Sequence, residues 1–568
     1  MHKAFEIGEI VDLIVAKLIE GNRALDVHAP KRRFGNYKDD CKPFRDIISL
    51  GSTASIFREP SLNAIWYRQR SLAPLFNSLG LLEDWRVRYE YYGTKGTLTL
   101  SRSLCAADAP MLLKYSSRIR MLEITGPTQL SFSEDQLWTL PGGPLFPHLQ
   151  QVYCLDEDPK ILAFIVRNMG DRLTHLSLSP ARFTSRVLAN SISDSLTHVS
   201  ANLQCLEILE DGFSPDLHTY ADQVLFTALR LACNARELSL HGALYYNRRA
   251  WNVILGFQTL KKLSIVLSYI GNPLRRTDTP AFSALTSLSI TMDPQLIDST
   301  TATLLPKAGL LCLRSSTWTI KTTDLVKNSQ VCHLITAIAD ACSISSLNHL
   351  DVVFTTTYTP YSPLDNLERV LEAATLQPLL PYAKLRYLRL RLGHPWILED
   401  SFLLEAARGW PDIETLELDP NPSAAKTTRI TLQGLEYLAL HCPRLQTLGL
   451  PVDFSQFDIP RHPAQGRPWF EGGGQTALRD LYLETPYVDS PSAVALSLSR
   501  MFPLLWKHAG SLQLSTTSSH HASRSMYQVY ELLPVLALAR EEGRIMASMS
   551  CVNSPSIVEI TSSNNLTA

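Results

Sequence analysis

The residues that could carry out chemistry are dispersed along the chain and form no recognisable catalytic group. His520 and His521 are adjacent among serines, but the further ligands that zinc requires do not accompany them. Gly472-Gly473-Gly474 follow a loop-like stretch rather than a strand, so they do not match a phosphate-binding loop. We therefore expect no enzyme activity, no metal and no cofactor. A catalytic site built from dispersed residues is the alternative, and a pocket that gathers acids and a histidine would favour it.

The best candidate for binding is a short basic stretch, Arg386-Tyr387-Leu388-Arg389-Leu390-Arg391. Alternate side chains of a strand point to the same face, so Tyr387, Arg389 and Arg391 are expected to form a local basic patch. Such a patch suits an acidic peptide or a phosphate group of a target protein. The alternative is a solvated strand face that binds nothing.

The element that positions these residues is a hexapeptide, apolar-x-x-apolar-x-apolar, which recurs along the chain. Clear copies occur at residues 119–124, 173–178, 203–208, 260–265, 285–290, 347–352, 385–390, 413–418, 445–450 and 478–483. Weaker copies occur at residues 95–100, 149–154, 235–240, 308–313 and 509–514. A strand this short cannot bury its leucines alone and has to stack on the next copy. Unrelated strands in ordinary α/β domains are the alternative, but they do not explain the bounded spacing.

Helical patterns separate the strands. They are expected at residues 159–169, 222–234, 325–341, 367–376 and 400–408. Strand, turn, helix and return is the unit of an α/β leucine-rich-repeat-like solenoid (horseshoe) whose strands line the concave side. Besides the basic stretch, the outward strand positions are Ser177, Glu207, Ser239, Ser264, Ser289, Asp351, Glu417, Gly449 and Tyr482. This mixed strip suits recognition of a protein and lacks the single sign that nucleic-acid binding needs.

Composition is that of an ordinary folded protein. The 568 residues carry a net charge of −1, with 45% hydrophobic and 19% charged residues. The ten cysteines form no C-x-x-C pair, which favours reduced thiols over a zinc site or a disulfide framework. The first residues lack the pattern of a signal peptide, and no run of about 18 apolar residues suggests a membrane span. We therefore expect a cytoplasmic or nuclear protein that binds neither nucleic acid nor membrane.

The first eighty residues have a helical rather than a strand pattern. Apolar residues recur at helical spacing at Ile7, Ile10, Val11, Ile14 and Leu18. A polar insert is expected near residues 20–45; its Lys31-Arg32-Arg33 triplet suits a solvated loop, with a nuclear signal as the alternative. A second helix is expected over residues 46–57, a break at Glu59-Pro60, and a third helix from Ser61.

The segment contains the motifs Phe5-Glu6-Ile7-x-Glu9-Ile10-Val11-x-Leu13-Ile14, Ile47-Ile48-Ser49-Leu50 through Phe57, and Leu62-x-x-Ile65-Trp66. With these motifs it resembles an F-box. Phe57 and Trp66 match the family pattern best. Arg58 to Trp66 and the following Ser71-Leu72-Ala73-Pro74-Leu75 are similar to F-box proteins of mushroom-forming fungi, which commonly carry irregular leucine-rich repeats behind the F-box. The resemblance implies a small all-α F-box-like helical domain over residues 1–80.

The resemblance also implies a function, that of a substrate-recognition subunit of a cullin-type (SCF) ubiquitin ligase. The helices would bind a Skp-type adaptor through Ile7, Ile10, Ile14, Ile48 and Trp66. The repeats would hold an unknown target protein, and its raised effective concentration near the ubiquitin carrier would promote transfer of ubiquitin to its lysines. The alternative is a non-catalytic scaffold, not attached to a ligase, whose first helices merely cap the repeats.

The remainder of the chain, residues 81–550, is predicted to be the irregular repeat solenoid. A flexible loop is expected near residues 453–475, which contain three prolines and three consecutive glycines. Residues 527–549 are rich in Leu, Ala and Val and are expected to cap the end of the solenoid. Residues 551–568 are expected to form a polar tail.

Overall fold

The computed structural model shows an α/β protein. It describes residues 13–15, 17, 42–80, 82–90, 93–100, 105–124, 128–130, 143–154, 159–178, 186–197, 202–209, 218–241, 253–267, 282–303, 305, 309–322, 326–356, 370–418, 428–455, 475–484, 488, 490–505, 527–540 and 542. Residues 456–474 of the loop expected near residues 453–475, the tail and the copy at residues 509–514 lie outside this part. The chain divides into two compact units, residues 1–310 and 311–568. The strands of all ten clear copies of the hexapeptide belong to a 14-stranded parallel sheet, which confirms the α/β class and the stacking of these copies.

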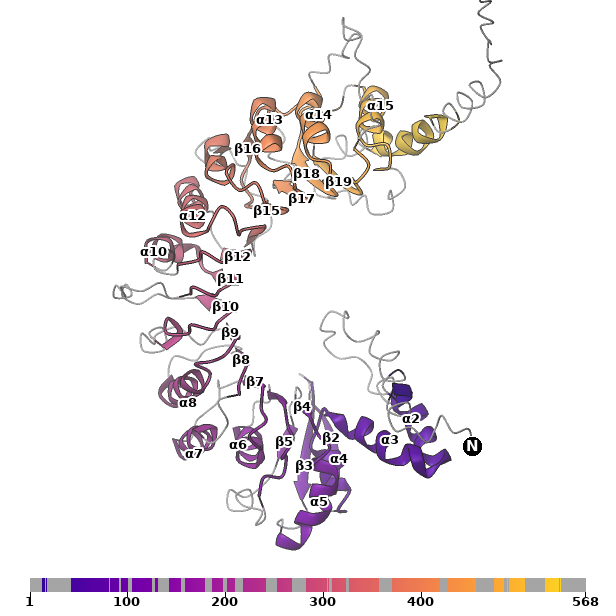
Figure 1. The fold of residues 1–568 in the computed structure, drawn as a ribbon, viewed down its shortest axis with the longest axis vertical. Helices are drawn as coiled ribbons and strands as arrows, with labels where there is room; N and C mark the ends of the chain where they lie inside the picture. Colours follow the sequence, from indigo (N-terminus) through magenta and orange to yellow (C-terminus); the bar gives the residue numbers. More distant parts are fainter. Residues whose placement is uncertain are drawn as a thin grey trace, which may run out of the picture. The chain divides into compact units, whose positions relative to one another are not determined.

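Unit 1 begins with helices and continues into the sheet. Its helices are α2 (Lys42–Thr53), α3 (Ser55–Tyr67), α4 (Ala73–Asn77), α5 (Ala109–Ser116), α6 (Pro159–Asn168), α7 (Arg186–Thr197), α8 (His218–Leu231) and α10 (Ile297–Thr303). Its strands in the long sheet are β1 (Arg68–Gln69), β4 (Met121–Ile124), β6 (Gln151–Cys154), β7 (His175–Leu178), β8 (Cys205–Leu209), β9 (Glu237–His241), β10 (Lys262–Leu267) and β11 (Ser287–Met292). Helices α6, α7 and α8 lie on the same side of the strands that they connect (Figure 1).

Unit 2 continues the same alternation. Its strands in the long sheet are β12 (Ser315–Thr322), β13 (His349–Thr356), β15 (Tyr387–Arg391), β17 (Thr415–Leu418), β18 (Thr447–Pro451) and β19 (Asp480–Glu484). Its helices are α12 (Asn328–Ala341), α13 (Asp400–Gly409), α14 (Leu432–His441) and α15 (Pro491–Met501). A small two-stranded sheet pairs β14 (Leu371–Glu372) with β16 (Trp396–Ile397). A last helical stretch over residues 527–540 buries Val529, Leu533 and Ala537, and the cap expected over residues 527–549 stays a prediction.

The hexapeptides occupy equivalent positions in successive repeats. In unit 1 the carbonyl oxygen of Arg120 accepts hydrogen bonds from the N–H groups of Gln150 and Gln151, at 2.8 and 3.0 Å. The same pair of N–H hydrogen bonds is accepted by a single carbonyl oxygen in other repeats as well. These carbonyls belong to Gln150, Thr174, Gln204, Arg236 and Lys261 in unit 1 and to Arg314, Asn348, Arg386, Glu414 and Gln446 in unit 2. This ladder sets the register of neighbouring strands, because it fixes where each strand begins.

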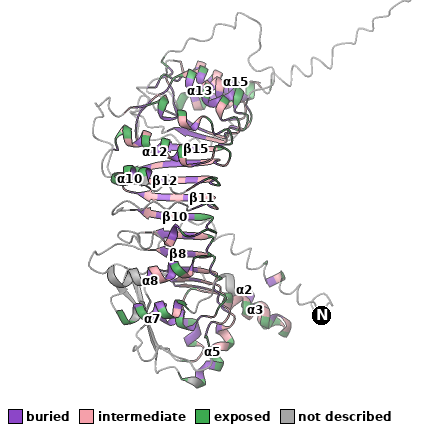
Figure 2. Ribbon diagram, turned by 60° about the vertical axis from the view of Figure 1, so that its left-hand side comes forward, coloured by how far each residue is buried: buried purple, intermediate pink, exposed green. Residues whose placement is uncertain are grey.

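The central apolar residue of each copy forms the core. Twelve of these residues are no more than 3% exposed: Leu122, Val152, Leu176, Leu206, Leu238, Leu263, Leu288, Leu350, Leu388, Leu416, Leu448 and Leu481. Along the strands, buried residues alternate with half-buried ones, as β10, β11 and β12 show (Figure 2). We call the face that carries the half-buried side chains the open face. It is the face that can contact another molecule.

The helix break expected at Pro60 is wrong. Helix α3 continues through Pro60, and the break falls at Ala54, whose backbone is extended. In the last turn of α2, Ser52 Oγ donates to the Ile48 carbonyl and Thr53 Oγ1 donates to the Leu50 carbonyl, bonds that slightly destabilise a helix. Helix α2 also starts at Lys42, inside the range expected for the polar insert.

The repeat expected at residues 308–313 is displaced. Leu311, its proposed central residue, is 65% exposed, and the strand is β12, which begins at Ser315. Leu313 is instead the first apolar residue of the copy, and Ser316 takes the central position. A serine is tolerated there because its Oγ accepts a 2.7 Å hydrogen bond from the buried Trp318 Nε1.

Two further expectations are corrected. Residues 95–100 lie in β3 (Gly93–Leu100), which pairs antiparallel with β2 (Leu82–Glu90) in a separate three-stranded sheet with β5 (Thr128–Leu130). Only two residues separate β2 from β3, and a connection that short permits only antiparallel pairing. Within residues 367–376, the described part forms β14 and a 3₁₀ turn rather than a helix, because the Leu371 N–H is taken by the Pro395 carbonyl at 2.8 Å.

Candidate recognition surface

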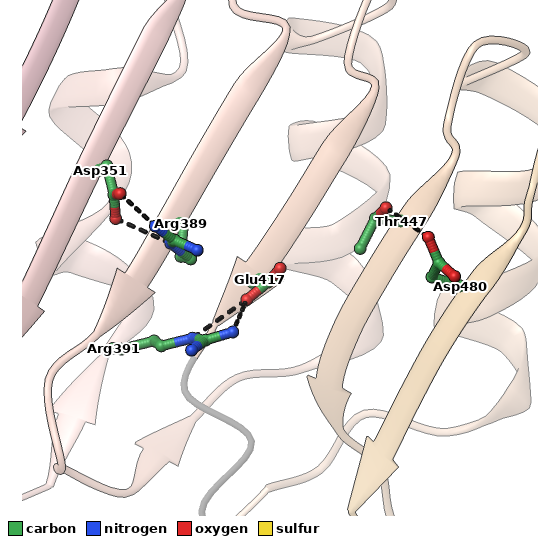
Figure 3. A network of polar contacts seen from close by, with 6 residues as sticks. All are labelled: Asp351, Arg389, Arg391, Glu417, Thr447 and Asp480. Atoms are coloured by element: carbon green, nitrogen blue, oxygen red, sulfur yellow. Dashed lines mark hydrogen bonds and ion pairs between the residues drawn. The ribbon is translucent and has the colours of Figure 1, made fainter. Parts of the chain in front are cut away.

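A cluster of polar and aromatic side chains occupies the open face of β13, β15 and β17 in unit 2. The sheet register places Asp351, Arg389 and Glu417 in one row across these strands. The neighbouring row places His349 beside Tyr387, and Arg391 lies two residues beyond Arg389 on β15. We call these six residues the β15 cluster. The structure therefore places the three residues of the predicted binding patch on one face of β15, and Figure 3 shows two of them, Arg389 and Arg391.

Each arginine of the β15 cluster is paired with an acid on an adjacent strand. Arg389 Nε donates to Asp351 Oδ1 at 2.9 Å, and its Nη2 donates to Asp351 Oδ2. Arg391 donates through Nε and Nη2 to Glu417 Oε2, at 3.1 and 2.7 Å. Figure 3 shows that the two pairs run in opposite directions from β15, one to β13 and one to β17. The two arginine charges are balanced by the two carboxylate charges, so the β15 cluster is neutral. The expectation of a basic patch is therefore wrong.

The two pairs differ in how much solvent they meet. The carboxylates are largely covered, with 9% of the Asp351 side chain and 8% of the Glu417 side chain exposed. Arg389 is 28% exposed and Arg391 is 50% exposed. The hydrogen bonds that Arg389 donates to the Asp351 carboxylate raise the pKa of Arg389, so this guanidinium is firmly charged. Arg391 is the part of the cluster that a ligand can reach most easily.

The aromatic residues form a flat platform beside the arginines. The rings of His349 and Tyr387 are stacked, with centroids 4.1 Å apart and planes inclined by 10°. Cζ of Arg389 lies 5.5 Å from the centroid of the Tyr387 ring, within the range of a cation–π contact. Burial lowers the pKa of His349 and raises the pKa of Tyr387, so both rings are favoured as neutral groups. Rigid aromatic surface beside an arginine is typical of the centres of protein interfaces.

The surrounding strands support this arrangement. Leu350, Leu388 and Leu416 anchor β13, β15 and β17 from the core face, and none of the three is exposed. On β18, Gly449 leaves the room that Glu417 occupies, because a Cβ atom there would lie 3.2 Å from Glu417 Cγ. Further along the open face, Thr447 Oγ1 donates to Asp480 Oδ2 at 3.3 Å (Figure 3). The polar surface is thus preorganised by backbone register and packing.

The residues expected to bind an adaptor are in different environments. Ile7 and Ile10 lie outside the described residues, and Ile14 is half-buried. Ile48 is 52% exposed on α2, whereas its neighbour Ile47 is 1% exposed. Helices α2 and α3 approach closely where a Cβ atom on Gly51 would lie 2.9 Å from Ser61 Cβ. Ile48 is thus presented to solvent by a tightly packed pair of helices.

The Trp66 side chain packs against other residues of unit 1. Its ring packs against Tyr115 of α5, with centroids 4.8 Å apart. Nearby, Arg118 Nη2 forms a 2.5 Å ion pair with Glu59 Oε2, and its Nη1 donates to Asn63. Together these contacts tie α3 to the following repeats. The family resemblance assigned Trp66 to adaptor binding, whereas these contacts give it a structural role.

No metal centre or membrane segment accompanies this surface in the part of the chain that the structure describes. No group of three or more His, Cys, Asp or Glu side chains there is placed to hold a metal ion. None of the helices in that part has the length and apolar content to cross a membrane.

Sequence reasoning missed the partners of the two arginines, although it identified Asp351 and Glu417 as outward-facing. The signal was present, because alignment of the hexapeptides on Leu350, Leu388 and Leu416 places Asp351, Arg389 and Glu417 at the same position.

Comparisons of the sequence with protein-family models and with curated proteins found no match.

Proposed function

We propose that the protein is a non-enzymatic recognition subunit that binds a target protein through the open face of its repeats. The β15 cluster carries this proposal. It combines a stacked His349–Tyr387 platform with a half-exposed Arg391, and its buried acids hold the arginines in fixed positions. A neutral surface with fixed charges of both signs favours a partner with complementary charges over a polyanion.

We further propose that α2 and α3 attach the protein to a Skp-type adaptor of a cullin ubiquitin ligase. Two features support this: the resemblance of residues 5–66 to an F-box, and the exposure of Ile48 on α2. Binding to an adaptor would cover this apolar side chain, and the ligase would then act by holding the target near a ubiquitin carrier.

The adaptor half of the proposal is tested with a single substitution rather than a deletion. Removing residues 1–80 would also remove β1 and the Trp66–Tyr115 contact, so loss of binding would be ambiguous. We expect Ile48→Asp to weaken binding of a purified Skp-type adaptor to the full-length protein by about tenfold or more, because a carboxylate would be desolvated at the contact. Affinity is measured by titration of the adaptor.

The matched control is Val187→Asp. Val187 is 69% exposed on α7 and lies outside α2 and α3, so this variant should bind the adaptor as the wild type does. No adaptor binding by the wild type would favour the scaffold function, and equal affinity of both variants would show that the adaptor does not bind at Ile48.

A further inference from the structure

The charge that a partner can reach on the β15 cluster is positive, although the net charge of the cluster is zero. The carboxylates of Asp351 and Glu417 are largely covered, whereas half of the Arg391 side chain is exposed. A group that approaches the open face therefore meets the arginines before it meets the acids. Repulsion between like charges disfavours a basic side chain of the partner there, and attraction favours an acidic one.

The ion pair with Glu417 uses only one edge of the Arg391 guanidinium. Nε and Nη2 both donate to Glu417 Oε2, at 3.1 and 2.7 Å. A guanidinium has five N–H groups, so three remain, two on Nη1 and one on Nη2. In the described part of the chain, Nη1 of Arg391 donates to no acceptor. The end of the guanidinium that joins Nη1 and Nη2 can thus bind a second carboxylate in bidentate geometry. We call it the open end of Arg391.

Apolar and aromatic surface lies at both ends of β15. The sheet register places the half-buried Val353 of β13 beside Arg391. At the start of the strand, the stacked rings of His349 and Tyr387 form the platform. Apolar surface beside a charge-assisted hydrogen bond excludes water and strengthens the bond. The open face therefore offers an apolar contact at one end of β15 and a carboxylate contact at the other.

The spacing of these two contacts fits an extended chain. Tyr387 and Arg391 are the first and last residues of β15, four residues apart on one face. At 3.3 Å per residue, their Cα atoms are about 13 Å apart. An extended segment of a partner covers the same distance in four residues and points both of its side chains to the same side.

The chemistry of the open end favours a carboxylate over a phosphoryl group. Its two N–H groups lie in one plane and match the two oxygens of a carboxylate. A dianionic phosphoryl group has a second charge, which the nearby carboxylates of Asp351 and Glu417 would repel.

We propose that the β15 cluster recognises an extended segment of the target in which Asp or Glu lies four residues from an apolar or aromatic residue. The apolar side chain covers the platform of His349 and Tyr387, and the carboxylate binds the open end of Arg391. This inference rests on the proposed function, because it names the segment that the open face binds.

The test selects a phage-displayed library of random nonapeptides on the full-length protein. We expect the selected peptides to share an acidic residue four positions from an apolar or aromatic one. A synthetic peptide of the consensus sequence should bind Arg391→Gln about tenfold more weakly than the wild type, because a charge-assisted pair is lost. The matched control is Arg386→Gln, which removes an exposed arginine just before β15 and should leave the affinity unchanged.

A double-mutant cycle identifies the direct contact. Replacing the acid of the peptide by its amide should weaken binding to the wild type about tenfold and binding to Arg391→Gln hardly at all. Additive losses, tighter binding of a phosphoserine peptide, selected peptides without an acid, or no selected peptides would overturn this specificity. Peptides that lack an acid but are lost with Tyr387→Ala would leave the proposed function intact. Peptides insensitive to both Arg391→Gln and Tyr387→Ala would overturn that function as well.

Discussion

Trp410→Ala is expected to lower the free energy of unfolding of unit 2 by about 3–5 kcal/mol. Trp410 is 1% exposed and follows α13 directly. Its indole Nε1 donates to the Leu379 carbonyl of the preceding repeat at 2.9 Å, and its own carbonyl lies 3.8 Å from Cys442 Sγ of the following repeat. The substitution would leave a large cavity between repeats and remove the partner of the Leu379 carbonyl.

The control for this prediction is Trp410→Phe, which keeps most of the buried aromatic volume but loses the hydrogen bond. We expect it to lose roughly 1–2 kcal/mol, clearly less than the alanine variant. Unfolding in urea, monitored by circular dichroism, measures both. An alanine variant within about 0.5 kcal/mol of the wild type would contradict the packing of these repeats around Trp410.

Arg389→Met is expected to lower the free energy of unfolding by about 2–3 kcal/mol. Methionine keeps the apolar stem of the side chain but leaves the Asp351 carboxylate, which is 9% exposed, without its cation. Breaking a fully buried pair costs about 3–5 kcal/mol, and the lower figure applies because the guanidinium of Arg389 is 28% exposed. The same urea experiment measures the loss.

Two further variants isolate the cause. Arg386→Met, on the residue just before β15, removes an exposed arginine that lies 3.7 Å from Glu414, and it should cost less than about 0.5 kcal/mol. The double variant Arg389→Met with Asp351→Leu should recover most of the loss, because no unpaired charge is then left under the open face. If Arg386→Met and Arg389→Met were equally destabilising, the ion pair with Asp351 would not be the reason.

The repeated hexapeptides predicted the strands well, because a strict pattern of buried leucines reports directly which face of a strand meets the core. The pattern failed where a polar residue took the central position. Ser316 is buried in β12, where its hydroxyl group accepts a hydrogen bond from Trp318. A pairing between two side chains of one strand is invisible to a search for apolar residues, so the copy was misplaced onto the exposed Leu311.

Helix boundaries and charge balance were harder to predict than strands. Pro60 suggested a helix break, yet the break falls at Ala54, directly after Ser52 and Thr53, whose hydroxyl groups donate to carbonyls of α2. The basic patch at β15 was inferred from one strand, whereas its charge is set by Asp351 and Glu417 on two others. The sequence of one strand shows which of its side chains share a face. The net charge of that face of the sheet also depends on the charges that neighbouring strands place beside it.

We propose that two separate surfaces of this chain bind two different proteins. The most direct measurement is quantitative co-purification of tagged full-length wild type, Ile48→Asp and Arg391→Gln from the cells that make the protein. The wild type should carry a Skp-type adaptor and a target protein, and Ile48→Asp should lose the adaptor and keep the target. Arg391→Gln should lose the target and keep the adaptor. Glutamine is chosen because it can still donate to Glu417 and so preserve the fold. A wild type without adaptor, or two variants that lose or keep the same partners, would contradict this account.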